Sequence, residues 1–271
     1  NNDRPGIMLA GAMRAYANRW AATPAQRVAV FTNNDDGHRT AVDMMARGVE
    51  VAAVIDSRAD APRIAECELL AGAQVVDSKG RLGLTSVTVR TADGATRTME
   101  CGALGVSGGW NPNVHLTCHQ RGRPEWNEAL AAFVPGKDLP QGMSVAGAAN
   151  GAFSTAAALA SGAAGAAAAL SDLGITAKGA DLPEAEDAPV NLAPFWYVKG
   201  SARAWIDQQN DVTVKDVKLA HQEGYRSVEH LKRYTTLGMA TDQGKTANMG
   251  GLAVMAEMTG KSIPETGTTI F

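Results

Sequence analysis

The chain has 271 residues, enough for one large domain or two, and its 45% hydrophobic and 20% charged residues are typical of globular proteins rather than disordered ones. The formal net charge is −3 and no basic block occurs, so nothing indicates a nucleic-acid or membrane partner. The apolar run at 156–170 is shorter than the roughly 20 residues of a membrane span. With no signal-peptide pattern and three scattered cysteines, we expect a soluble, cytoplasmic protein.

The first part of the chain alternates helix and strand patterns. Residues 8–20 carry apolar side chains at helical spacing, and Thr23-Pro24 ends the pattern. Residues 27–32 form a short apolar run, 38–47 a helical segment, and 49–56 a second apolar run that ends on an acid. A strand, a helix and a strand within about thirty residues predict a parallel sheet covered by helices.

After residue 70 the patterns change to short strands joined by turns. In chain order we expect a β-meander of three strands (73–77, 83–91 and 96–101), single strands at 103–106 and 143–146, and a long Ala-rich helix at 150–170. This order is similar to one half of a flavoenzyme with two dinucleotide domains. We therefore predict an α/β fold, a Rossmann-like half of such a flavoprotein (a βαβ unit plus a β-meander), followed by a small helical module.

The loop after residues 27–32 departs from a nucleotide site. A dinucleotide fold carries G-x-G-x-x-G there, whereas this chain has residues 32–37 as TNNDDG. Asp35 and Asp36 would repel a pyrophosphate, and the side chains would keep the backbone away from it. Asp56 does lie where a ribose-binding acid belongs. We favour a Rossmann-shaped domain that has lost its nucleotide, with atypical binding as the alternative.

Three further motifs allow more than one interpretation. The small residues at 145–155 could offer backbone N–H groups to an anion or simply pack a helix tightly. The loop at 242–246 (DQGKT) is not a P-loop, because position 239 is Met, but it could hold one phosphate or be a solvated loop. His115, Cys118 and His119 are spaced like metal ligands, yet a structural or surface role is favoured, and we predict no metal site.

Four segments resemble the alpha subunit of heterotetrameric sarcosine oxidase. They are residues 106–112 (VSGGWNP), 210–213 (NDVT), 224–249 (GYRSVEHLKRYTTLGMATDQGKTANM) and 259–265 (TGKSIPE). The resemblance spans essentially the whole chain, and its most specific block is 224–249. It implies that the chain is an internal segment of a much larger subunit, whose GxGxxG half and folate-binding domain lie outside this sequence.

The resemblance implies a function for the whole complex. Sarcosine, oxygen and water would give glycine, formaldehyde and hydrogen peroxide, or methylene-tetrahydrofolate when folate is present. FAD in the beta subunit would oxidise the amine, FMN at the alpha–beta interface would pass electrons to oxygen, and tetrahydrofolate would bind elsewhere. The alpha subunit would hold NAD without turnover chemistry, with beta, gamma and delta subunits as partners and no catalytic residue in this segment.

The resemblance also implies site residues. Carried over position by position, the residues are Ala148, Phe153 and Thr155 for NAD, and Arg233, Gln243, Lys245 and Thr246 for the FMN interface. The implied parts are a connecting helix of the first dinucleotide domain (1–26), a degenerate second Rossmann-like domain (27–102), the return into the first, NAD-binding domain (103–176), a linker (177–200), and a helical module resembling a BFD-like iron–sulfur domain (201–271).

The helical module departs from its iron–sulfur relatives. Those carry Cys pairs before the D-V-T motif, whereas residues 207–210 are DQQN and all three cysteines lie far upstream, so a cluster-less module is expected. Two alternatives remain. A fragment of an NAD(P)H-dependent flavin oxidoreductase would need a glycine fingerprint and a redox CxxC or cluster. A cofactor-free interaction scaffold would lack flavin absorbance and release no NAD.

Overall fold

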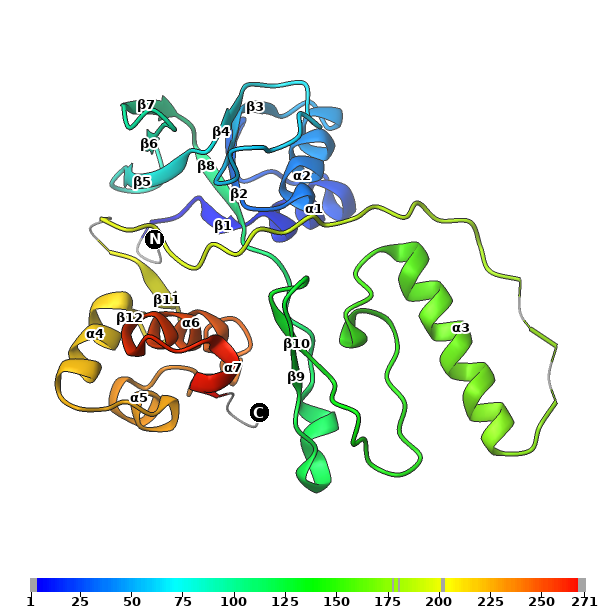
Figure 1. Cartoon of the computed structure of the whole chain (residues 1–271). Coiled ribbons are helices and arrows are strands. Elements are labelled where there is room, and N and C mark those ends of the chain that lie inside the picture. The colour runs from blue at the N-terminus through cyan, green and yellow to red at the C-terminus, as the bar shows by residue number, and fades with distance from the viewer. Residues whose placement is uncertain (1–3, 177, 180, 201–202, 268–271) are drawn as a thin grey trace. The chain divides into compact units, whose positions relative to one another are not determined.

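The computed structural model describes residues 4–176, 178–179, 181–200 and 203–267. The chain divides into two compact units, the first made of Asn1–Gly109 with Asn191–Thr266 and the second of Trp110–Val190 with Gly267–Phe271. The first unit holds a parallel α/β sheet, a β-meander and a helical module, and the second holds a hairpin and one long helix (Figure 1). The predicted α/β fold class is confirmed.

A five-stranded parallel sheet forms the centre of the first unit. Its order is β1 (Ile7–Leu9), β8 (Ala103–Ser107), β2 (Arg27–Thr32), β3 (Glu50–Asp56) and β4 (Leu69–Ala71). β2 pairs with β8 on one side and with β3 on the other, so that Phe31 lies opposite both Val106 and Ile55. β2 is covered on both faces, since Val28 and Val30 are fully buried in one core cluster and Ala29 in the other, as a continuous apolar run indicates.

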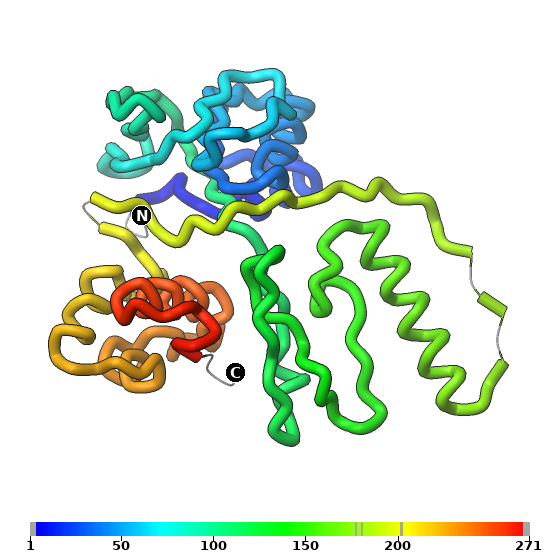
Figure 2. The backbone as a smooth tube through the Cα atoms, in the orientation of Figure 1, coloured from blue at the N-terminus to red at the C-terminus, as the bar shows by residue number. Residues whose placement is uncertain are grey.

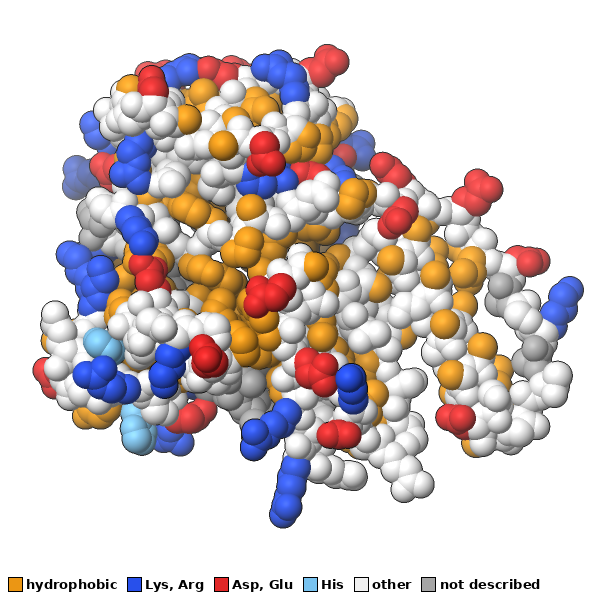
Figure 3. Space-filling model, in the orientation of Figure 1, with side chains coloured by type: hydrophobic (Ala, Val, Ile, Leu, Met, Phe, Trp, Pro, Cys, Tyr) orange, Lys and Arg blue, Asp and Glu red, His pale blue; other side chains and the backbone are white. Residues whose placement is uncertain are grey.

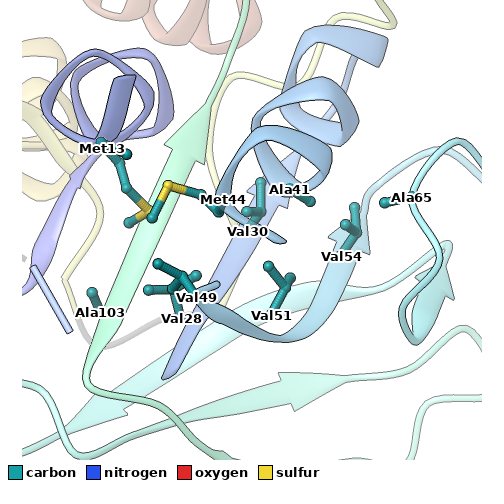
Figure 4. Packing of buried hydrophobic residues seen from close by; sticks show 11 residues of the cluster. Met13, Val28, Val30, Ala41, Met44, Val49, Val51, Val54, Ala65 and Ala103 are labelled. Carbon is teal, nitrogen blue, oxygen red and sulfur yellow. The ribbon is translucent and has the colours of Figure 1, made fainter. Parts of the chain in front are cut away.

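Two helices cover one face of this sheet, α1 (Ala10–Trp20) and α2 (Asp35–Ala46). Met13 of α1 and Met44 of α2 point toward each other, and both are fully buried (Figure 4). The helix expected at 8–20 begins two residues later, because Leu9 is extended and pairs with Val106 in the sheet. The helix expected at 38–47 begins earlier, because a capping side chain starts it at Asp35.

The opposite face of the sheet packs on the predicted β-meander. Its antiparallel strands are β5 (Gln74–Lys79), β6 (Ser86–Arg90) and β7 (Thr96–Glu100). Val87 and Val89 of β6 join Ile55 and Leu104 of the parallel sheet in one buried cluster. Alternation along β6 therefore directs its apolar side chains to the core.

The second unit contains mostly short elements. They are the 3-10 helices η1 (His115–Arg121) and η2 (Gly147–Asn150), the hairpin β9 (Glu125–Asn127) and β10 (Ala132–Val134), and α3 (Thr155–Asp172). The strand predicted at 143–146 is wrong: a turn closes there, with Met143 N–H donating to Pro140 O at 3.0 Å. α3 begins at Thr155 rather than at residue 150, because Gly151 has φ of 81° and interrupts the helical backbone.

The C-terminal part of the first unit is the predicted helical module. Its elements are the hairpin β11 (Trp205–Asp207) and β12 (Val212–Thr213), and the helices α4 (Val214–Gln222), α5 (Val228–Thr235), α6 (Asn248–Thr259) and α7 (Ile263–Thr266). Val217, Leu231 and Met255 are each fully buried and come from three different helices. α5 starts only at Val228, because Gly224 adopts φ of 94° after α4 and separates the two helices.

Acidic and basic side chains alternate over the visible face, without a patch of one sign (Figure 3). No described helix combines the length and apolar character needed to cross a membrane. The division into parts at residues 26, 102, 176 and 200 stays a prediction, although β1 and α1 lie in and against the same sheet as β2.

Candidate functional site

The loop between β2 and α2 is closed by its own side chains. Asn34 is the N-cap of α2, and its Oδ1 accepts hydrogen bonds from the N–H groups of Asp36 at 3.0 Å and Gly37 at 3.3 Å. Its Nδ2 donates to the Ser107 carbonyl at 3.2 Å. In a nucleotide-binding Rossmann domain such amides would face a phosphate. Here the Asn34 side-chain oxygen accepts the hydrogen bonds of these amides in place of a phosphate.

Asp56 lies at the end of β3, where a dinucleotide fold has its ribose-binding acid, and its carboxylate is already hydrogen-bonded within the protein. It is fully buried, and its Oδ2 accepts from His38 Nε2 at 2.7 Å and from Arg58 Nη2 at 2.7 Å. Arg58 Nη1 reaches Asp35 Oδ1 at 2.8 Å. Burial acts to raise the pKa of Asp56, but the hydrogen bonds from His38 and Arg58 outweigh it and hold that pKa below its usual value. The acid is therefore an ionised partner of Arg58.

A distant segment of the chain covers this edge of the sheet. Residues 191–193, here called the strap, are part of an extended trace without helical turns (Figure 2). Asn191 Nδ2 donates to Asp35 Oδ2 at 2.6 Å. Ala193 N–H donates to Asn33 O at 3.0 Å, and Asn33 Nδ2 returns a bond to Ala193 O at 2.8 Å. The strap is thus held to the loop by one backbone hydrogen bond and two hydrogen bonds from asparagine side chains.

Two further contacts fix the strap. Arg58 Nη1 donates to the carbonyl oxygen of Asn191 at 2.6 Å. This bond links the strap to the buried Asp56, which Arg58 also contacts. Leu192 lies so close to Gly109 that a Cβ at position 109 would meet its Cδ1 at 2.5 Å. Sequence reasoning missed the strap and Arg58. Arg58 could have been found as a cation two residues after Asp56, whereas no local pattern marks a partner more than 130 residues away.

The residues predicted to contact NAD lie in the second unit, around the start of α3. Ala148 is an exposed residue of η2, Phe153 is half-buried before the helix, and Thr155 is its exposed first residue. Ser154 caps the helix, with its Oγ accepting from Ala157 N–H at 3.1 Å. The three predicted residues therefore lie within one short turn and the first turn of a helix, where backbone N–H groups are available.

The residues predicted for the FMN interface lie on two elements of the helical module. The side chain of Arg233 is 67% exposed on α5, and its Nη1 donates to Glu229 Oε2 at 3.1 Å. Gln243, Lys245 and Thr246 are exposed in the loop before α6. Thr246 Oγ1 already donates to Asp242 Oδ2 at 2.7 Å, and Gly244 N–H to Asp242 Oδ1 at 3.1 Å.

This loop therefore carries its own anion. The hydrogen bond from the Thr246 hydroxyl holds the pKa of Asp242 below its usual value, so the carboxylate is charged at neutral pH. A ligand phosphate that bonds to Thr246 has to replace Asp242. Arg233 is likewise paired with a carboxylate, that of Glu229, so an external anion at this cation has to share it or replace that partner.

The loop is built around a buried amide. A Cβ at Gly238 or at Gly244 would each come within 2.3 Å of Asn248 Oδ1, so both positions require glycine. Asn248 is 7% exposed, and neither polar atom of its side chain has a hydrogen-bond partner among the described residues. Nearby, Asp207 Oδ2 accepts from Gly238 N–H at 2.8 Å, which ties the loop to the β11–β12 hairpin.

Metal ligands do not gather in the described part of the chain, where no group of three or more His, Cys, Asp or Glu is placed to hold an ion. Cys118, one of the spaced candidates, is buried and directs its Sγ at Val114 O. Residues 207–210, at the position of the Cys pairs in iron–sulfur relatives, instead form a turn in which Asp207 Oδ1 accepts from the N–H groups of Gln209 and Asn210.

Known proteins show which family this arrangement matches. Residues 201–271 match the family described as the sarcosine oxidase A3 domain. All of the chain aligns with sarcosine oxidase subunit alpha from Rhizobium meliloti (strain 1021) at 42% identity, and with that from Corynebacterium sp. (strain U-96) at 38%. The chain is a relative of sarcosine oxidase alpha subunits. It spans 28% and 30% of the lengths of these two proteins, and the resemblance seen in its sequence is confirmed.

A solved structure shows the same fold. L-proline dehydrogenase from P. horikoshii superposes with a TM-score of 0.74 and 20% identity, covering 100% of this chain and 52% of that chain. At this level of identity the likeness concerns the fold alone. It agrees with a Rossmann-like α/β region followed by a helical module.

Proposed function

We propose that this chain is a cofactor-holding part of a sarcosine oxidase alpha subunit. The observation that carries the proposal is 42% identity along its entire length to a protein of that name. The complex would oxidise sarcosine with oxygen, giving glycine, formaldehyde and hydrogen peroxide, or methylene-tetrahydrofolate with folate. Beta, gamma and delta subunits would be its partners, with FAD and tetrahydrofolate bound elsewhere in the complex and a cytoplasmic location for the whole.

Within this proposal the chain supplies no catalytic residue. The cluster of Asp35, His38, Asp56 and Arg58 is the most acid–base-rich group described, but its members hydrogen-bond to one another and to the strap. Asp56 and His38 are at most 1% exposed, so substrate cannot reach them. A buried ion pair of this kind supports structure rather than proton transfer.

NAD would bind at Ala148, Phe153 and Thr155. The start of α3 supports this site, because the first N–H groups of a helix favour a negatively charged ligand. Ala148 is small and exposed, so a ligand can pack against the backbone of η2, and the half-buried Phe153 offers an apolar surface beside it. NAD held here would serve structure, because no acid or base lies among the three residues.

FMN would lie against the helical module at Arg233, Gln243, Lys245 and Thr246. A phosphate enclosed between subunits needs cations, because burying an unpaired charge is costly. Arg233 and Lys245 supply that charge, while Gln243 adds a neutral donor. The exposure of all four residues in this chain supports an interface role.

Substitution of the two cations tests the FMN site. In the assembled complex, the double change Arg233→Ala with Lys245→Ala should lower FMN retention or slow electron arrival at FMN, and leave NAD content unchanged. Lys261→Ala, an exposed lysine of the same module, is the matched control. Unchanged FMN content and unchanged oxygen turnover in the double variant would show that these residues are structural.

Peroxide production tests the wider proposal. The complex that contains this chain should form hydrogen peroxide from sarcosine and oxygen, whereas the purified segment alone should form none. Peroxide from the segment alone would refute a purely cofactor-holding role. A complex that purifies without flavin absorbance and releases no NAD would favour an interaction scaffold instead.

A further inference from the structure

A cavity in the first unit is lined by none of the residues proposed for NAD and FMN. Its volume is about 590 Å³, within the range of small-molecule sites. Leu9, Thr32 and Ser107, the last residues of β1, β2 and β8, all line it. The cavity therefore opens at the carboxyl ends of parallel strands, where α/β sheets commonly bind their ligands.

Aromatic side chains form much of its wall. They are Phe31, Phe195, Trp196, Tyr197 and Trp205. Phe31 and Phe195 meet edge to face, with ring centroids 6.2 Å apart. The whole chain contains 14 aromatic residues (5 Trp, 4 Tyr and 5 Phe), so 5 of those 14 line this one cavity. Such a wall suits a flat ring, because aromatic faces and edges pack well against another aromatic group.

Two guanidinium groups give the cavity positive charge. Arg4 bonds to neutral groups, with Nε donating to Gly80 O at 3.1 Å and Nη1 to Ser78 Oγ at 2.6 Å. Arg203 lies over the Trp205 ring, 5.7 Å from its centroid. Among the described residues neither arginine forms an ion pair with a carboxylate. Arg4 is half-buried, where a cation is normally paired, and Arg203 is exposed.

The net charge of the groups that line the cavity stays positive when its one acidic residue is included. Asp77 is the one carboxylate of the wall, and its Oδ1 accepts from Ser78 N–H at 2.8 Å. The indole Nε1 of Trp205 is buried and has no acceptor among the described residues. A ligand that brings an acceptor to this edge would satisfy it, since a buried donor without a partner costs about 1–3 kcal/mol.

We propose that this cavity binds a small aromatic anion of mononucleotide size. The ring would lie among the aromatic side chains, the anionic group would compensate Arg4 and Arg203, and an acceptor atom would face the Trp205 indole. The inference is independent of the NAD and FMN proposals, because it uses none of their residues.

The test measures binding of AMP and phenyl phosphate to the assembled complex by equilibrium dialysis. At least one of them should bind saturably, and its uncharged counterpart, adenosine or phenol, should bind at least tenfold more weakly. Arg203→Gln should weaken binding about tenfold or more, and Trp205→Phe, which keeps a ring but removes the donor, severalfold. Binding should also weaken as salt rises.

Matched controls lie on α1. Arg19→Gln and Trp20→Phe change the same residue types at exposed positions away from the cavity, and should leave binding unchanged. Thermal unfolding of each variant verifies that the fold is retained. The proposal is overturned if neither probe binds at millimolar concentration, or if the double variant Arg203→Gln with Trp205→Phe binds as tightly as the unaltered protein.

Discussion

Asp56 illustrates how a nucleotide-binding position can become a structural one. At the end of β3 an acid could bind a ribose, but here its carboxylate receives hydrogen bonds from His38 and Arg58 in a buried setting. A buried carboxylate without partners would be strongly destabilising. The Arg58 guanidinium therefore compensates the buried charge of Asp56. The same group also donates hydrogen bonds to Asp35 and to the Asn191 carbonyl oxygen of the strap.

Removing the Arg58 guanidinium should lower the free energy of unfolding of the protein. Arg58→Ala leaves Asp35 and Asp56 buried without their ion-pair partner, and we expect a loss of about 3–5 kcal/mol in the free energy of unfolding. Arg27→Ala, which breaks an exposed pair with Glu50, should cost less than about 1 kcal/mol. Urea denaturation measures both, and equal losses would contradict the assigned role of Arg58.

The same cluster predicts a dependence of stability on pH. Because the pKa of Asp56 is lower in the folded protein than its usual value near 3.8, the ionised form stabilises the fold above about pH 4. This contribution is lost as pH falls through the lower, folded pKa. Urea midpoints measured between about pH 3 and 6 should fall less steeply in Asp56→Asn than in the unaltered protein. Identical slopes would show that Asp56 is not an ionised partner.

Cysteine reactivity offers a residue-scale test of the core. Burial raises the pKa of the Cys101 thiol to about 11, although Arg27 acts in the opposite direction. The thiolate is the reactive form, so native Cys101 should resist iodoacetamide at about pH 8 and be labelled only in urea. Peptide mass spectrometry identifies the labelled cysteine. Rapid labelling of Cys101 in the native protein would contradict its buried position.

Among the elements, α4 begins with a capping box formed by two residues of its own sequence. Thr213 N–H and its hydroxyl both bond to Asp216 Oδ2 at 2.7 Å, forming a capping box. Thr213→Ala should therefore lower the free energy of unfolding by about 1 kcal/mol. Ser227, the N-cap of α5, makes no capping hydrogen bond with its side chain, so Ser227→Ala is the control and should change little. A comparable loss in both variants would contradict the role of the box.

The sequence predicts those elements whose patterns are local. β2 is predicted residue for residue, because 27–32 is a short apolar run between polar segments. The β-meander is also predicted, as three short strands joined by turns. The strand expected at 143–146 fails because apolar residues there lie beside a turn, and an apolar run alone does not provide a pairing partner.

The candidate sites also fall into features that a local sequence pattern predicts and features that only the fold reveals. The loss of a glycine fingerprint at 32–37 can be read from the sequence, and the Asn34 cap explains how the loop is closed. The strap cannot be predicted, since Asn191 and Asp35 are 156 positions apart and neither carries a motif. The cavity is likewise invisible, because its aromatic residues come from separate segments that only the fold brings together.

At the scale of the whole molecule, the two units use helices differently. In the first unit α1 and α2 bury one face each, with Met13 and Met44 in the core. In the second unit α3 has 18 residues, of which none is buried. A long Ala-rich helix without buried residues is normally stabilised by packing against a further surface. This supports the proposal that α3 lies against bound NAD and the rest of a dinucleotide domain in the complete subunit.

The most direct test of a cofactor-holding role is the NAD content of the assembled complex, measured by chromatography after heat release. The unaltered complex should release one NAD per alpha subunit. Ala148→Leu places a bulky side chain where the ligand would approach η2, and should release most of the NAD while leaving FMN content and the folded state unchanged. Ala168→Leu, a change of the same kind at an exposed position near the other end of α3, measures any loss that bulk alone causes. Full NAD occupancy in Ala148→Leu, or an unaltered complex without NAD, would contradict the assignment.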